Sequence, residues 1–150
     1  MTLIKNSKIV HDHWTVLEEK QALQADHNII DLTYWNANKD ELIASKAPLG
    51  LLIQGDTSPD QFIDDIQHFE LIAINFPTFV DGRGYSLAKT LREKHHYTQE
   101  IRAIGEVLPD QALYLTRVGF DALEFSTKET SLLALEKLNE FSVFYQAATN

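Results

Sequence analysis

A short turn holds the residues of this chain that are best suited to chemistry. Residues Val80–Ser86 read VDGRGYS, so two glycines flank Arg83 immediately before an amphipathic helix. Glycine lets backbone N–H groups come close to a ligand, and the N-terminus of a helix attracts anions. A guanidinium can form a bidentate contact with sulfate, sulfite, phosphate or a carboxylate. The turn therefore predicts an anion-binding site, with ligand-binding residues Asp81, Gly82, Arg83, Gly84 and Ser86.

The same residues also fit a purely structural role. The glycines would then serve a tight connection from strand to helix, and Arg83 would pair with Asp81 or Glu106. The spacing matches neither the Walker loop, which also needs a lysine, nor the GxGxxG fingerprint of dinucleotide-binding proteins. Residue types alone leave binding and structure open as explanations of this turn.

A second arginine lies inside a predicted strand. Arg102 comes one residue after the start of IRAIGEV, and a charged side chain there needs a carboxylate or a ligand as its partner. We count Arg102 among the candidate ligand-binding residues, with a structural ion pair as the alternative. The nearby carboxylates that could balance it are Glu100, Asp121 and Glu124.

Three further polar residues follow that strand and complete the predicted site. Glu106 lies at its carboxyl end, and Asp110 and Gln111 come directly after Pro109 at a helix start. An aspartate in the first turn of a helix also complements the helix dipole, which explains Asp110 without any ligand. Glu106, Asp110 and Gln111 are therefore candidates that share the edge of the sheet with Arg83.

The residue types in this sequence give little support for metal binding or for covalent catalysis. The chain has no cysteine, which excludes thiolate catalysis and Cys-ligated metals. His11 and His13 share one face of a short β-prone segment, but no third ligand is visible near them, so we expect no metal site. No spacing typical of a Ser–His–Asp triad and no flavin, nicotinamide, haem or iron–sulfur motif can be identified, which leaves the cofactor unassigned.

Composition narrows the class of protein further. The formal net charge is −9, yet residues 82–117 carry six basic and four acidic side chains. Nucleic-acid binding without sequence preference needs a broad basic face, so this window better suits one small anion or an acidic partner surface. No apolar run is long enough to span a bilayer, and the N-terminus lacks the pattern of a signal peptide. We therefore expect a cytoplasmic protein that binds neither nucleic acid nor membrane.

Apolar strands alternate with amphipathic helices from residue 28 onward. This order predicts one α/β domain over residues 1–150, with about five βα units on a mainly parallel sheet and an N-terminal strand or hairpin in the first 17 residues. Two topologies remain open: a flavodoxin-like doubly wound sheet, or a partial TIM-barrel-like sheet. In both, ligands bind at the carboxyl ends of the strands. The predicted strands are 28–32, 49–54, 71–76, 101–107 and 122–125, and the predicted helices are 34–45, 58–69, 85–95, one from residue 109, and 130–145.

Three residues mark predicted helix ends. Thr33 is expected to cap the first helix, and Ser58, followed by Pro59 and by Gln61 at the third helical position, is typical of a capping box. Gly119 stands where a helix would end with a left-handed residue.

The central part of the chain resembles a bacterial family, domain of unknown function 934. Members of that family are often encoded beside assimilatory sulfite reductase and carry the label of an oxidoreductase of sulfite reduction. Many members have a cysteine before the Gly-Phe pair, where this chain has Val118. The residues that carry the resemblance are Phe79, Asp81–Ser86, Leu91, Arg92, Glu100–Ala103, Gly105, Val107, Asp110, Gln111, Arg117 and Gly119–Asp121, with weaker matches around Trp14 and Trp35 and at Phe141–Val143, Tyr145 and Gln146.

The resemblance implies a role in sulfur assimilation. One hypothesis is an accessory protein of sulfite reduction that binds a small oxyanion or nucleotide at Asp81–Ser86, or docks on sulfite reductase or its electron donor. A second is a cofactor-dependent oxidoreductase that uses Asp81, Glu106 or Asp110 as acid or base, which leaves enzyme activity undecided. A third is a non-catalytic adaptor for sulfite reductase. An exposed sheet edge would also favour a homodimer.

Overall fold

The computed structural model describes residues 1–18, 21–23, 26–78 and 80–149, and the side chains of these residues up to 140. Strands and helices alternate through most of the chain, and three short 3₁₀-helices are labelled η. In chain order the elements are β1 (Thr2–Lys5), β2 (Lys8–Val10), β3 (Trp14–Val16), β4 (His27–Asp31), α1 (Leu32–Ser45), β5 (Leu49–Gln54), η1 (Pro59–Gln61), η2 (Ile63–His68), β6 (Leu71–Phe76), α2 (Arg83–Glu93), β7 (Glu100–Gly105), η3 (Pro109–Gln111), α3 (Ala112–Val118), β8 (Ala122–Phe125) and α4 (Lys128–Thr149).

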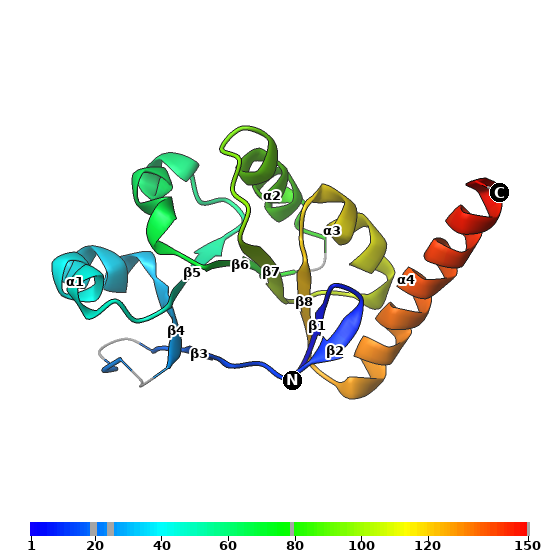
Figure 1. Cartoon of the computed structure of the whole chain (residues 1–150), viewed down its shortest axis with the longest axis horizontal. Helices are drawn as coiled ribbons and strands as arrows, with labels where there is room; N and C mark the ends of the chain where they lie inside the picture. Colours follow the sequence, from blue (N-terminus) through cyan, green and yellow to red (C-terminus); the bar gives the residue numbers. More distant parts are fainter. Residues whose placement is uncertain (19–20, 24–25, 79, 150) are drawn as a thin grey trace.

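All of these strands form one eight-stranded sheet, in the order β2-β1-β8-β7-β6-β5-β4-β3. Strands β3 to β8 are parallel, and β1 pairs antiparallel with both β2 and β8. Figure 1 shows that the sheet curls strongly and that the helices cover its convex, outer face. The predicted α/β class, the mainly parallel sheet and the N-terminal hairpin are confirmed.

The strand order bears on the topology that the sequence left open. From β4 to β8 each parallel strand lies beside the next one in the chain, so every crossover steps in the same direction. A doubly wound sheet instead reverses its order at a switch point and carries helices on both faces. The described strands show no such reversal, so the flavodoxin-like order is not found. After β5 the chain forms 3₁₀ turns in place of an α-helix, and the count of five βα units is therefore not confirmed.

The two edge strands of the sheet are neighbours in the chain. β2 ends at Val10 and β3 begins at Trp14, so residues 11–13 connect the opposite edges. Four extended residue steps reach at most about 14 Å, which forces the sheet to curl until its edges approach each other. Figure 1 shows the chain from the N-terminal hairpin passing across the open side of the curl to β3.

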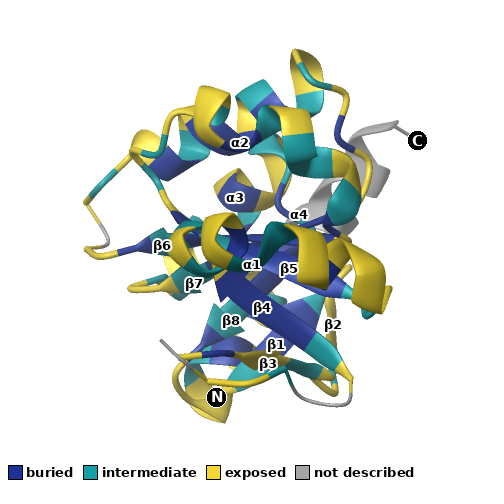
Figure 2. Cartoon of the chain, turned by 90° about the vertical axis from the view of Figure 1, so that its left-hand side faces the viewer, coloured by how far each residue is buried: buried dark blue, intermediate teal, exposed yellow. Residues whose placement is uncertain are grey.

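The sheet buries apolar side chains on both faces. On the convex face Ile72, Ile74 and Ile101 belong to the main core, which they share with the helices. On the concave face Ile29, Leu71 and Ala73 form a smaller cluster. Figure 2 shows buried strands and helices whose outward surfaces are exposed. Burial on both faces explains why the central strands are continuous apolar runs without polar alternation.

Several local predictions were wrong in detail. The first helix begins at Leu32, and its cap is Asp31, whose carboxylate accepts from the Tyr34 N–H at 2.8 Å, so Thr33 is not the cap. The helix predicted from Ser58 is two 3₁₀-helices, since Phe62 has a φ of −142°, and Ser58 makes no side-chain cap hydrogen bond. Gly119, with a φ of +123°, ends α3 as expected.

Candidate functional site

A groove runs along α2, and two of the predicted site residues, Arg83 and Ser86, line it. It has a volume of about 530 Å³ and lies between α2 and the segment that follows β5. Its walls come from chain segments that leave the carboxyl ends of β5 and β6, two adjacent parallel strands. The lining residues are Gly55–Asp60 on one side and Arg83, Ser86, Leu87, Thr90, Lys94 and His95 on the other.

The turn before α2 is held by a carboxylate of its own. One oxygen of Asp81, Oδ1, accepts from the backbone N–H of Arg83 at 3.1 Å and from its Nε at 3.0 Å. The other oxygen accepts from Nη2 at 2.8 Å. Hydrogen bonds from Arg83 hold the pKa of the Asp81 carboxyl at about 2. An anionic group thus already sits at the start of α2, where the sequence predicted a ligand.

The remaining face of the Arg83 guanidinium is held more loosely. Its Nη1 donates to the Asp56 carboxylate at 3.3 Å, and these two side chains are 61% and 56% exposed. An exposed ion pair of this kind contributes about 0–1 kcal/mol, because water solvates both charges well in its absence. Asp81 therefore fixes the position of Arg83, whereas Asp56 is a partner that another anion can replace.

The glycines of the turn are explained by packing. A Cβ on Gly84 would lie 2.6 Å from the ring of Phe76, and one on Gly55 would lie 2.8 Å from the backbone nitrogen of Gly84. Both glycines let α2 approach the sheet closely. Gly82 has a φ of −87°, and a Cβ there would meet only Tyr85, at 3.7 Å. The sequence-based reason, close approach of the backbone to a ligand, is therefore not needed to explain Gly84.

Seven of the nine predicted residues lie outside the lining of the groove, and three of them follow β7. Glu106 is exposed and donates its backbone N–H to the Phe76 carbonyl at 2.8 Å. Asp110 pairs with Lys137 of α4 at 2.9 Å, and Gln111 accepts from the Leu108 N–H at 2.9 Å at the start of η3. The structure thus brings Asp81, Arg83, Gly84 and Ser86 together at α2, and places these three on the neighbouring loop in structural contacts.

Arg102 lies on the concave face of the sheet, away from the groove. Its side chain is 2% exposed, and its register neighbours are Ala73 on β6 and Ala122 on β8, whose small side chains leave room for a guanidinium. Nε donates to Glu100 at 2.9 Å, as the sequence allowed, and Nη1 donates to Asp12 at 3.1 Å. Leaving a buried charge without a partner costs several kcal/mol, so these carboxylates are required.

Sequence reasoning missed three residues at these two places. Lys94 and His95 line the far end of the groove. Arg83, Ser86, Leu87, Thr90 and Lys94 recur at helical spacing on one face of α2, and that period could have identified Lys94. Asp12 is 90 positions from Arg102 in the chain, and its pairing depends on how the sheet closes, so no local signal could have revealed it.

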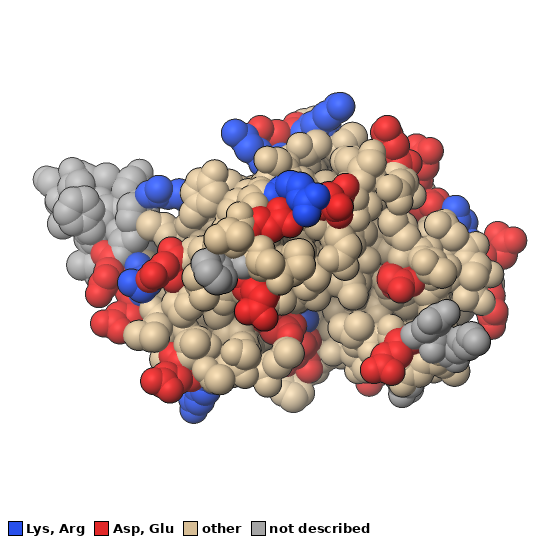
Figure 3. Space-filling model, turned by 180° about the vertical axis from the view of Figure 1, so that it is seen from behind, with Lys and Arg blue, Asp and Glu red and all other residues tan. Residues whose placement is uncertain are grey.

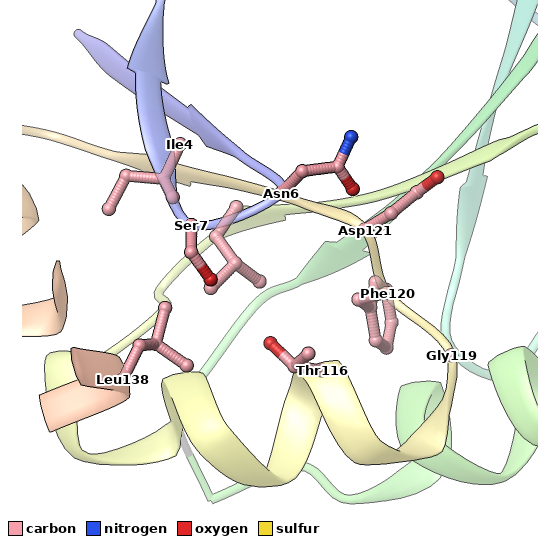
Figure 4. Close-up of a pocket in the computed structure, with 9 residues that line it drawn as sticks. Ile4, Asn6, Ser7, Thr116, Gly119, Phe120, Asp121 and Leu138 are labelled. Carbon is pink, nitrogen blue, oxygen red and sulfur yellow. The ribbon is translucent and has the colours of Figure 1, made fainter. Parts of the chain in front are cut away.

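A second cavity offers less for chemistry. It has a volume of about 210 Å³ and lies between the turn of the β1–β2 hairpin, α3 and α4. Figure 4 shows Ile4, Leu138 and Phe120 around it, with the hydroxyls of Ser7 and Thr116 also directed toward it. It lies beside Asp121, which precedes β8 at the amino ends of the parallel strands, opposite the edge where ligands of parallel α/β sheets bind.

On the face drawn in Figure 3, Lys and Arg side chains occur singly or in small groups among more numerous acidic ones. Among the residues that the structure describes, no cluster of three or more His, Asp or Glu side chains could hold a metal ion. In the same described part of the chain, no helix is both long enough and apolar enough to cross a membrane.

Fold and site together define an α/β protein with a curled, mostly parallel sheet and a mixed-charge groove at the carboxyl ends of its strands. Residues 50–150 match the model of a family described as bacterial protein of unknown function (DUF934), and the chain belongs to this family. The match covers both walls of the groove and Arg102, and excludes β1 to β4 and Asp12. No curated protein matches the chain.

Proposed function

We propose that this protein is an accessory protein of assimilatory sulfite reduction that binds a small oxyanion, or a nucleotide that carries one, in the groove beside α2. The resemblance to proteins encoded beside sulfite reductase supplies the pathway. The observation that carries the binding role is the exposed face of the Arg83 guanidinium, which lines the groove and donates to Asp56 at 3.3 Å.

The groove offers suitable partners for an oxyanion at one end. Arg83 presents a planar fork of N–H donors, and the Ser86 hydroxyl lies one helical turn further along the same wall. Lys94 lies 11 residues beyond Arg83, which corresponds to about 16 Å along a helix. A small oxyanion therefore contacts only the Arg83 end, whereas an extended ligand such as a nucleotide reaches Thr90 and Lys94 as well.

Calorimetric titration with sulfite, inorganic phosphate and an adenine nucleotide tests this proposal. We expect Arg83→Ala to abolish binding of all three ligands and Lys94→Ala to weaken only the nucleotide. Lys89→Ala, which removes a charge from an exposed position of α2 outside the groove, should leave every affinity unchanged. Equal affinities for the wild type and Arg83→Ala would remove the groove from the proposal.

An adaptor role is the second candidate, favoured by one feature of α4. Leu132 and Leu133 are 50% and 46% exposed on this helix. Large exposed apolar side chains of this kind can mark a protein contact. If sulfite reductase or its electron donor docks here, Leu132→Glu should abolish co-purification from sulfate-grown cells, and the groove variant Arg83→Ala should not. If the Leu132→Glu variant still co-purifies with sulfite reductase or its electron donor, docking at this helix is contradicted.

A further inference from the structure

The concave face of the sheet holds a buried charge cluster that the groove does not explain. Arg102 is buried between Ala73 and Ala122, and its two carboxylate partners differ in character. Glu100 is buried on the same strand and is shared with a second cation, because its Oε1 accepts from Lys5 Nζ at 2.8 Å. One carboxylate, Glu100, therefore faces two cations, Lys5 and Arg102, and Asp12 supplies a second negative charge beside Arg102.

Asp12 belongs to a short segment outside the regular elements of the fold. Residues 11–13 form no helix or strand and join the two edge strands of the sheet. The Asp12 side chain is 35% exposed, compared with 2% for Arg102. Its other oxygen accepts from the Trp14 N–H at 2.9 Å. A partly solvated carboxylate on a short irregular connector thus closes over a fully buried guanidinium.

A cavity lies beside Asp12. It has a volume of about 440 Å³ and is lined by Asp12 together with Leu3, Val10, His11 and Lys128. Asp12 thus lines the cavity and also contacts the Arg102 guanidinium at 3.1 Å, whereas Arg102 itself does not line it. Glu124 lies two residues along β8 from Ala122, on the same concave face of the sheet as Arg102. Burial raises the pKa of Glu124, and the charge of Arg102 partly offsets that rise.

We infer that this cavity is a second anion-binding site, which Asp12 masks. The Asp12 carboxylate occupies the position that an oxyanion or carboxylate ligand would take on Nη1 of Arg102, and Lys128 adds a positive charge to the lining. A ligand enters by displacing Asp12 toward solvent, and the connector 11–13 moves with it. The site is independent of the groove beside α2 and stands even if that groove binds nothing.

The variant Asp12→Asn tests the inference, because it removes the charge but keeps an oxygen for the Trp14 N–H. The probe is inorganic sulfate, with sodium chloride at equal ionic strength as the reference, and the readout is the melting temperature. We expect sulfate to raise the melting temperature of Asp12→Asn more than that of the wild type. The double variant Asp12→Asn with Lys128→Ala should lose part of this gain. Asp40→Asn, which removes an exposed carboxylate on α1, should respond as the wild type does.

A second measurement covers the case in which Asp12→Asn does not fold. The chain has four arginines, so its Nε–Hε resonances are few enough to assign in the wild type. Titration with sulfate, at constant ionic strength, should shift the Arg102 resonance and speed amide exchange in residues 11–14. Sulfate that shifts neither in the wild type would overturn the inference and leave Asp12 as a pure closing contact. A shift equal in sulfate and chloride would overturn it as well.

Discussion

The competition between Asp56 and a bound anion gives the sharpest test of the groove. Asp56→Asn removes the carboxylate that contacts the outer face of Arg83, at 3.3 Å, and leaves the Asp81 contacts intact. An exposed pair of this kind contributes about 0.2–1 kcal/mol. An anion that must first break it loses the same amount, which corresponds to about 1.4- to 5-fold in affinity. We therefore expect Asp56→Asn to tighten the binding of phosphate or sulfite by this factor.

The assay needs a control for general electrostatics. Asp60 also lines the groove, but it makes no ion pair with Arg83 that the structure describes. Calorimetric titrations of Asp56→Asn and Asp60→Asn in the same buffer compare two variants of equal net charge. Direct competition predicts a larger gain for Asp56→Asn than for Asp60→Asn. Equal gains would show that only the field of the groove matters, and an unchanged affinity in both variants would refute competition by Asp56.

Three further predictions concern stability and its dependence on pH. Gly84→Ala should destabilise the protein by about 1–3 kcal/mol in urea titrations, because its Cβ would lie 2.6 Å from the Phe76 ring; a more stable variant would refute the packing role. Arg83 holds the pKa of Asp81 at about 2, below its value of about 3.9 in an unfolded chain, so this pair stabilises the fold above about pH 4 and loses its effect as the pH falls toward 2. The difference in urea midpoint between the wild type and Arg83→Ala should therefore shrink over that range, and a constant difference would contradict the assignment. Burial raises the pKa of Glu124, so the folded state holds this proton more tightly, and the wild type should lose stability as the pH rises above about 4.3. Glu124→Gln should therefore be more stable than the wild type at pH 7.5 but not at pH 4. An equal gain in stability at both pH values would argue against burial as the cause.

Much of the secondary structure could be predicted from local patterns. Strands β5, β6 and β8 have the bounds that the apolar runs 49–54, 71–76 and 122–125 indicate. Such runs are reliable because a strand buried on both faces has no polar alternation to confuse its ends. Helix caps were less certain, because Asp31 and Thr33 are both residue types that accept from a free N–H and only the backbone geometry decides between them.

The candidate site could be predicted in part, for a similar reason. Asp81, Arg83 and Ser86 are close in sequence, and a strand followed by a helix always places such a turn at the edge of the sheet. Their immediate contacts were not determined by residue type. The guanidinium of Arg83 forms its tightest contacts with Asp81, two residues away, and the outer contact with Asp56 depends on how β5 and β6 lie side by side.

The amino-acid sequence by itself determined the α/β class, the main strands and the location of an arginine turn before α2, because each depends on residues within about one turn or strand of one another. The tertiary structure alone decided that the sheet curls with its helices on the outer face, and that Asp12 meets Arg102 across 90 positions of chain. These features depend on strand order and on closure by residues 11–13, and a contact between distant segments exists only once the whole sheet has formed.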